Sequence, residues 1–305
     1  MTTAGPGATP GGAAPPAGPR VIDVTDAEGP AVRRFLEGRV ETSLFLLSNL
    51  RAFGPRMGES PYSGDFRALV DGQTILAVWC VTRNGSVLIQ ADGHAAHADV
   101  VDADMAARGA DVRFVLGDWA PAARFWALVR ERQGLVPTQE SREVLYRLVL
   151  PAPAGEPPAA WDVRTLTVAD ADAWDPLAAA FLREQRLPLG TPGSRRAGFA
   201  TSAGNGHWWG AWDGGALVSI ASFNAYHHPV AQVGGVYTLP ARRRQGFARA
   251  VMQTILRDAV ADHGLERVIL FTGEGQRSAR ALYESLGFEA IGAFGLFSGE
   301  PAAAP

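Results

Sequence analysis

The stretch that decides the fold reads Gly234-Gly-Val-Tyr-Thr-Leu-Pro240-Ala-Arg-Arg-Arg-Gln-Gly246-Phe-Ala-Arg-Ala-Val-Met-Gln-Thr-Ile255. Its first part is β-branched and aromatic, which predicts a strand, and the strand stops at Pro240 because proline cannot donate to a ladder. A helix with one apolar face is predicted next, since apolar residues recur at every fourth position: Phe247, Val251, Ile255 and Ala259.

The turn between this strand and this helix has the pattern Arg243-x-x-Gly246-x-Ala248. Small residues allow a ligand to approach the backbone closely, and the N–H groups of the first helical turn have no partner inside the helix. Together with the positive end of the helix dipole and the arginine charges, they form an anion site. The turn therefore predicts a ligand that carries a pyrophosphate.

Further along the chain, Arg267–Thr272 reads as a strand, and Leu282-Tyr283-Glu-Ser-Leu-Gly287-Phe288 closes the helix that follows it. This ordered set resembles the GNAT superfamily of acyl-CoA-dependent transferases. In that family a strand ending near V-x-P precedes [R/Q]-x-x-G-x-[G/A], and a Tyr-x-x-x-Gly-Phe run comes later. The resemblance covers residues 161 to 298 and is closest to bacterial members.

The resemblance implies an N-acetyltransferase that moves an acetyl group directly from acetyl-CoA to a primary amine in a ternary complex. It implies that Tyr283 protonates the departing CoA thiolate, although a purely packing role for this tyrosine is the alternative. Gln276 stands where many members carry an asparagine that reaches the cofactor. The cofactor-binding residues implied in this way are Val236, Tyr237, Thr238, Arg243, Arg244, Gln245, Gly246, Phe247, Ala248, Arg249 and Gln276.

The residue that would deprotonate the amine stays open. The motif strand contains no glutamate, and the candidates are Glu184, His207, His227 and His228, each of which reads equally as an ordinary surface side chain. Trp208, Trp209, Phe223 and Tyr226 predict either an aromatic-lined cleft or two well-packed strands. The acceptor is a small amine or a peptide N-terminus, and a non-catalytic acyl-CoA sensor or scaffold is the rival function.

The chain reads as two similar halves. A tail at residues 1–19 and a Pro-rich linker at residues 151–160 each precede a strand, a capping turn and an amphipathic helix. Both halves then continue as strands and helices in the same order. We therefore expect an α+β fold with a mixed sheet, built from two tandem GNAT-like domains at residues 20–150 and 161–298.

The first half lacks the features that predict chemistry in the second. Its turn at residues 92–99 contains two aspartates beside a helix start and no arginine, so it would repel a pyrophosphate. Ala127 stands where the second half has Tyr283. The first half is therefore expected to be degenerate and to shape the substrate cleft or a dimer surface.

Composition narrows the classes of function. The net charge of −3 argues against a nucleic-acid binder, and no apolar run approaches the ~20 residues of a membrane helix. The single cysteine, Cys80, lies in an apolar run and reads as a buried filler. All 28 basic residues are arginines, which indicates a GC-rich, bacterial genome, and a reducing compartment, the cytoplasm, is expected.

Two further motifs compete with this interpretation. Gly273-Glu-Gly275-Gln-Arg-Ser278 mimics a dinucleotide fingerprint, but it lies near the end of the chain with only one strand left. His94, His97 and Asp99 could ligate a metal, but the sequence supplies no fourth ligand, so we expect a polar turn and no metal site.

Overall fold

The computed structural model describes residues 18–91, 96–152, 155–158 and 161–302. The first half contains β1 (Arg20–Asp23), α1 (Gly29–Glu37), α2 (Val40–Phe53), β2 (Gly64–Asp71), β3 (Thr74–Thr82), β4 (Ser86–Ala91), α3 (His97–Ala107), β5 (Phe114–Asp118), α4 (Trp119–Gln133) and β6 (Leu135–Val149). The second half contains β7 (Asp162–Thr165), η1 (Val168–Asp170), α5 (Ala171–Glu184), α6 (Pro192–Gly204), β8 (Trp208–Asp213), β9 (Ala216–His227), β10 (Val230–Thr238), η2 (Pro240–Arg242), α7 (Phe247–Ala261), β11 (Arg267–Gly273), α8 (Arg277–Ser285) and β12 (Glu289–Pro301).

Apart from the two short 3-10 helices, both halves contain the same elements in the same order. The repeat is strand, two helices, three strands, helix, strand, helix and strand. The sequence predicts one helix after the first strand of each half, and the second helix, α2 or α6, was not predicted. That the repeat arose by duplication stays a prediction, as does the division of the chain at residues 151–160.

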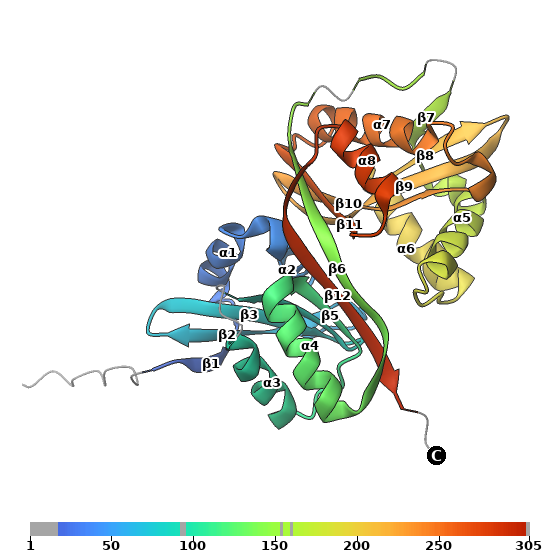
Figure 1. Cartoon of the computed structure of the whole chain (residues 1–305). Coiled ribbons are helices and arrows are strands. Elements are labelled where there is room, and N and C mark those ends of the chain that lie inside the picture. The colour runs from blue at the N-terminus through green and yellow to red at the C-terminus, as the bar shows by residue number, and fades with distance from the viewer. Residues whose placement is uncertain (1–17, 92–95, 153–154, 159–160, 303–305) are drawn as a thin grey trace, which may run out of the picture.

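One mixed sheet of twelve strands runs through the whole molecule in the order β1-β2-β3-β4-β5-β12-β6-β11-β10-β9-β8-β7. Among the strands of the described residues, only the pairs β4–β5 and β10–β11 are parallel. The last strand of each half crosses to the other half, because β6 pairs with β11 and β12 pairs with β5. Figure 1 shows β6 and β12 as two long strands side by side through the middle of the molecule.

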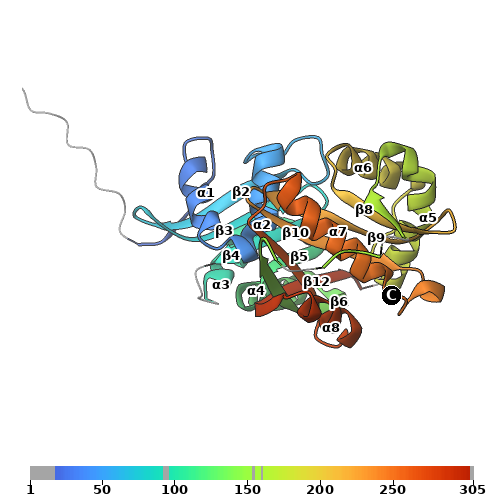
Figure 2. The same cartoon turned by 90° about the horizontal axis from the view of Figure 1, so that it is seen from above.

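The second half of the sheet is covered on both faces. Alternate residues of β8 to β11 enter one apolar cluster with α7 and α8. On the other face, α5 and α6 cover Leu217, Ile220 and Tyr237. Further along that same face, α2 of the first half covers Val230 and Ile269. Figure 2 shows these helices from above.

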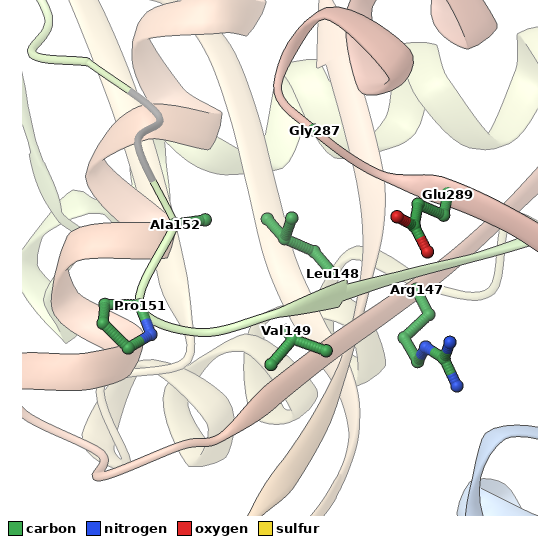
Figure 3. A pocket seen from close by; sticks show the side chains of 7 residues that line it. All are labelled: Arg147, Leu148, Val149, Pro151, Ala152, Gly287 and Glu289. Atoms are coloured by element: carbon green, nitrogen blue, oxygen red, sulfur yellow. The ribbon is translucent and has the colours of Figure 1, made fainter.

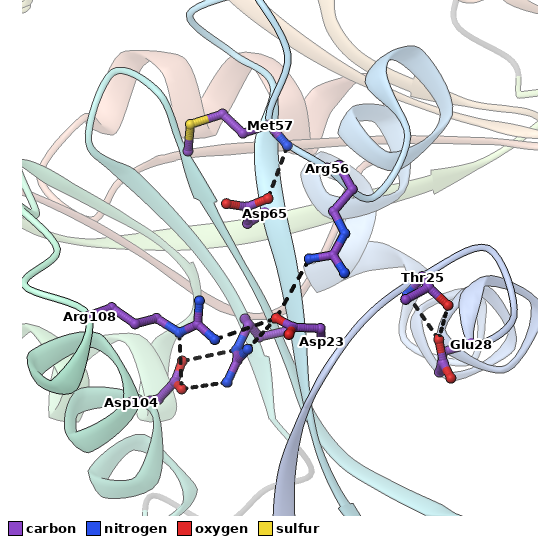
Figure 4. Close-up of polar contacts among 9 residues, drawn as sticks. Asp23, Thr25, Glu28, Arg56, Met57, Asp65, Asp104 and Arg108 are labelled. Atoms are coloured by element: carbon purple, nitrogen blue, oxygen red, sulfur yellow. Dashed lines mark hydrogen bonds and ion pairs between the residues drawn. The ribbon is translucent and has the colours of Figure 1, made fainter.

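A buried arginine fixes α3 onto the first half of the sheet (Figure 4). Arg67 of β2 donates to both oxygens of Asp104 on α3, at 2.6 and 3.2 Å, and also to Asp23 of β1. These contacts lower the pKa of Asp23, chiefly through the hydrogen bond from Arg67. The second half makes the corresponding contact differently, because Trp209 of β8 donates to Asp258 of α7 at 2.8 Å.

Further expectations from the sequence concern Cys80, the tail, the linker and a metal site. Cys80 is fully buried in β3 and burial raises the pKa of its thiol, as expected for a packing residue. The tail up to residue 17, parts of the linker and His94 lie outside the described residues. Within the described ranges, no cluster of three metal-ligating side chains occurs, and no helix is long and apolar enough to cross a membrane.

The exchange of β6 and β12 predicts that neither half is stable alone. Residues 1–152 and 155–305, co-expressed as two chains, should purify as a 1:1 complex, because β6 and β12 hold each other along most of their length. Each fragment alone should aggregate, since it exposes unpaired strand edges. Size-exclusion chromatography checks this, and Val144→Pro in β6 should prevent co-purification because it removes a ladder donor. A soluble, folded fragment of residues 155–305 by itself would contradict the expectation.

Candidate active site

The strands β10 and β11 separate part-way along their length. They pair only where Val230–Gln232 faces Arg267–Ile269, although β10 continues to Thr238 and β11 to Gly273. The rest of β10 therefore has no strand partner on its β11 side. Backbone groups along that edge are available to an extended ligand, as on any open strand edge.

A β-bulge interrupts β10 beside this opening. The pairing with β9 skips from Gly234 to Tyr237, so Gly235 and Val236 have no partner there. Gly235 has φ of +62°, a left-handed conformation that suits glycine. Bulges re-aim backbone and side-chain groups and are frequent next to active sites. The predicted cofactor residues Val236, Tyr237 and Thr238 all lie along the opening.

The loop after β10, where the sequence predicts an anion site, has an unusual backbone conformation. Gly246 caps α7 with φ of +97°, and Arg244 also has a left-handed backbone, with φ of +63°. For a residue with a side chain this costs roughly 1–2 kcal/mol, and such strain clusters at functional sites. None of the backbone N–H groups of residues 244–249 donates a hydrogen bond to a described residue. They lie at the positive end of the α7 dipole.

The motif arginines divide into two kinds. Arg243 donates to the Thr238 carbonyl at 3.0 Å and pairs with Glu184 of α5 at 2.6 Å, so it fastens the loop to α5. Arg249 donates to the Ser285 hydroxyl at the end of α8. Arg244 is exposed and makes no ion pair with a described residue, which leaves its charge for a bound anion.

An aromatic pair closes the loop on one side. The rings of Trp161 and Phe247 stack with centroids 4.3 Å apart. A side chain on Gly246 would begin 3.2 Å from the Trp161 ring, which is tighter than an ordinary contact. Glycine at this position therefore meets two demands, a left-handed backbone and the absence of a Cβ.

Tyr283 of α8 lies in the apolar cluster under α7 with Val251 and Leu270. It is only 6% exposed, and its hydroxyl makes no hydrogen bond with a described residue. Burial raises the pKa of this phenol, so the proton stays on oxygen throughout the neutral range. The side chain can therefore serve as an acid.

The first half holds the helix that carries Tyr283. Tyr146 of β6 is fully buried beside the Tyr283 ring, with centroids 6.2 Å apart. Its hydroxyl donates to Glu284 at 2.7 Å and accepts from Arg280 at 3.1 Å, so two α8 side chains are bound to a strand from the other half.

The four candidate bases lie in different places. His227 is the last residue of β9 and contacts Glu37 of α1, and His228 lies in the turn between β9 and β10. At ~3.3 Å per strand residue the bulge is roughly 25 Å from His228. His207 lies among aromatic rings on the α7 face, where burial lowers its pKa to about 4. Only Glu184 contacts the loop, through Arg243.

The four aromatic residues considered for a cleft do not form one wall. Trp209, Phe223 and Tyr226 pack on the α7 face, whereas Trp208 faces α6 and stands 3.6 Å from where a Gly235 side chain would begin. Well-packed strands therefore account for three of them, and Trp208 alone borders the bulge.

On the face that carries α5 and α2, a polar strip separates the two apolar clusters. Ser222 and Asn224 of β9 lie in this strip beside Gly234, and Asn224 is exposed although β9 is flanked by strands on both sides. A Gly234 side chain would overlap the Asn224 amide, with only 1.9 Å between the atoms. This strip borders the bulge and gives a second substrate a route to it. Sequence reasoning missed it, because it depends on which helix covers which strand.

Two remaining features are less informative. Gln276 caps α8 and lies against Gly273, at the far side of the opening. A shallow pocket at the end of β6 is lined by Arg147, Leu148, Val149, Pro151, Ala152, Gly287 and Glu289 (Figure 3). That pocket lies by the start of β11, where the strands are still paired, and it contains no free helix N-terminus.

Residues 174–288 match the model of the Acetyltransferase (GNAT) family. Over this segment of its second half, the chain is similar to GNAT acetyltransferases. The human N-acetyltransferase 8 is 52% identical over 50 residues, which are 16% of this chain and 22% of that protein. The expected mixed α/β fold is confirmed.

Solved structures with this fold extend over both halves. A Drosophila protein aligns with a TM-score of 0.69 at 14% identity, covering 93% of this chain and 99% of its own. A tandem GNAT protein from the clavulanic acid biosynthesis pathway aligns with a TM-score of 0.59 at 15% identity, covering 94% and 100%. A GCN5-related N-acetyltransferase from Sphaerobacter thermophilus also gives 0.59 at 15% identity, covering 94% and 98%.

The loop geometry predicts that Gly246→Ala weakens CoA binding at least ~10-fold, because a Cβ strains the left-handed cap and presses on Trp161 beside the anion site. Isothermal titration calorimetry measures this. Gly275→Ala is the matched control, since a Cβ there meets nothing within 4 Å and the residue belongs to the competing glycine motif. Equal CoA affinity of the two variants would contradict the placement of the pyrophosphate.

Proposed function

We propose that this protein is an N-acetyltransferase that moves an acetyl group from acetyl-CoA to a primary amine in a ternary complex. The observation that carries the proposal is the opening between β10 and β11. It combines an unpaired strand edge, a bulge and unpartnered N–H groups at the start of α7. An extended molecule with a pyrophosphate at one end fits these features in one orientation.

The chain's residues divide the task between them. The edge of β10 at Val236, Tyr237 and Thr238 binds the pantetheine arm as an added strand would. The loop with Arg244 and Gly246 binds the pyrophosphate through backbone N–H groups and charge. The remaining loop residues, Arg243, Gln245, Phe247, Ala248 and Arg249, shape this loop, and Gln276 borders the opposite side.

Acetyl-CoA supplies an activated acyl group whose carbonyl carbon is attacked by the amine nitrogen. A backbone N–H at the bulge would stabilise the oxygen as it gains charge. Tyr283 would donate its proton to the leaving thiolate, because the buried phenol keeps that proton at neutral pH.

The first half is proposed to be a GNAT-like domain that binds no acyl-CoA. Its parallel pair β4–β5 stays paired up to Ile89 and Gly117, and β4 ends two residues later. A side chain on Gly117 would begin only 2.2 Å from the Ile89 carbonyl oxygen, so no space exists between these strands. A bacterial, cytoplasmic setting and a homodimer stay predictions.

The second candidate is a non-catalytic acyl-CoA sensor. It requires the same opening but no phenol beside it. A tyrosine hydroxyl with no hydrogen bond among the described residues favours the enzyme, because a packing role would be met equally by phenylalanine.

Thiol release tests the two candidates. With acetyl-CoA and a panel of amino acids, polyamines, aminoglycosides and short peptides, the enzyme should release free thiol with at least one acceptor. With the best acceptor, Tyr283→Phe should lower kcat ~100-fold or more with little change in CoA affinity, because the lost interaction belongs to the transition state. Tyr226→Phe, which removes a hydroxyl elsewhere, is the control. A fall in kcat of less than about threefold would show that Tyr283 is a packing residue and not the acid.

Stoichiometry tests the assignment of the first half. Calorimetric titration of the intact chain with CoA should give one site per chain, because only β10 and β11 separate. Gly246→Ala should weaken that single site and reveal no second one. Two equivalent sites would overturn the assignment.

A further inference from the structure

Glu143 is a buried carboxylate that no step above uses. It lies on β6, the strand that the first half contributes beside β11. Its side chain points to the face that carries α2 and the polar strip. Tyr146, three residues on, faces α8, whereas Arg147, four residues on, pairs with Glu41 of α2.

The strand register places Glu143 level with the bulge. Gln232 of β10 faces Ile269 of β11, so Val236 and Gly273 are each four residues further along. Glu143 is the β6 partner of Gly273. Both oxygens of its carboxylate lie 3.8–3.9 Å from where a Gly273 side chain would begin, and Gln276 lies 3.4 Å from the same point. Because residue 273 is a glycine, no side chain of that residue lies over the carboxylate.

The surroundings of Glu143 are unusual for a carboxylate. It is 7% exposed and makes no ion pair with a described residue. Ser141 donates to Oε1, while Oε2 accepts nothing from the described residues and is not fully buried. Burying a charge with so little compensation is costly, so such groups are retained where they act.

The elements packed around Glu143 offer no charge that would neutralise it. On β11 and β12 its neighbours are Gly273 and Phe294, and Phe45 of α2 contacts Phe294. Glu274, which pairs with Arg142, acts on Glu143 as a like charge. Burial first, and Glu274 in addition, raise the pKa of Glu143, against the effect of the Ser141 hydrogen bond.

We propose that Glu143 is the general base that takes the proton from the attacking amine; this rests on the proposed acetyl transfer. As the amine nitrogen bonds to the acetyl carbon and the C–S bond breaks, one N–H proton passes to Glu143 Oε2. Tyr283 gives one proton to sulfur, and the two residues exchange these protons with solvent afterwards. The acid and the base thus approach the opening from opposite faces of the sheet.

The aromatic rings beside Glu143 fit the same role. Phe271 and Phe294 stack with centroids 4.8 Å apart, and the ring of Phe45 of α2 lies 6.1 Å from Phe271 and 6.0 Å from Phe294. They give the acceptor an apolar wall next to a carboxylate that attracts its ammonium form. In this arrangement the first half completes the active site of the second.

Glu143→Gln tests the assignment, because it keeps the shape and removes the base. With the best acceptor from the amine panel, kcat should fall ~100-fold or more, while CoA affinity by calorimetry and the melting temperature stay close to wild type. The wild-type kcat should fall as pH drops through the pKa of Glu143, and this acidic limb should be absent in the variant. Glu289→Gln, an exposed carboxylate change on the neighbouring strand β12, is the matched control and should behave like wild type.

Ser141→Ala provides a second, independent measurement that holds even where Glu143→Gln fails to fold. Removing the Ser141 hydrogen bond raises the pKa of Glu143 further, so the acidic limb should move to higher pH with an unchanged plateau. A carbon-13 NMR titration of the free protein should show one glutamate carboxyl titrating above the usual range and moving upward in Ser141→Ala.

The outcomes separate this assignment from the proposed function. If the wild type turns over and the kcat of Glu143→Gln lies within about threefold of the wild-type kcat, only the role of Glu143 is overturned. The same holds if the acidic limb of the pH profile does not move in Ser141→Ala. If wild type binds CoA but releases no thiol with any amine, the proposed acetyl transfer falls and the base with it.

Discussion

The backbone hydrogen bonds of β6 and β12 are the constraint on which the rest of the molecule depends. Each strand leaves its own half, pairs with the other strand and then with the last parallel strand of the opposite half. A sheet that would otherwise have two open edges in its middle becomes continuous, which removes the most exposed hydrogen-bonding groups from solvent. The same exchange sets Tyr146 under α8 and Glu143 at the end of β11. The first half therefore places two of its side chains beside elements of the second half.

The two parallel pairs show how one architecture gives two outcomes. In the first half, β4 and β5 stay paired to within two residues of the end of β4, and Ile89 lies directly against Gly117. In the second half, β10 runs on beyond its last pair with β11 and is followed by an eight-residue connection, 239–246, to α7. The additional strand length and the loop create both an unpaired strand edge and a group of backbone N–H groups without partners among the described residues.

Burial shifts the pKa values of Tyr283, Glu143 and His207. It raises the pKa of Tyr283 and of Glu143, and it lowers the pKa of His207 to about 4. In each case the neutral form is favoured, because a low-dielectric environment penalises charge. The phenol of Tyr283 therefore keeps a proton that it can donate, and the carboxylate of Glu143 becomes more basic. The imidazole of His207, on the α7 face, stays uncharged at neutral pH. Tyr283 lies on α8, and Glu143 lies on β6, the strand on the far side of β11 from the opening.

The sequence by itself determined those features whose physics is local. The strand, glycine turn and helix at residues 234–255 follow from proline, glycine and a four-residue apolar spacing, and the structure has them where they were expected. The order of elements in both halves was also predicted, apart from α2 and α6. Tertiary structure alone decided that β6 lies beside β11, that Trp208 and Trp209 face opposite sides, and that His227 and His228 lie away from the bulge. Glu143 and Gly273 are neighbours only through this pairing. A strand can form hydrogen bonds with any other strand of suitable length. The contact between residues far apart in the chain is therefore not indicated by any local sequence pattern.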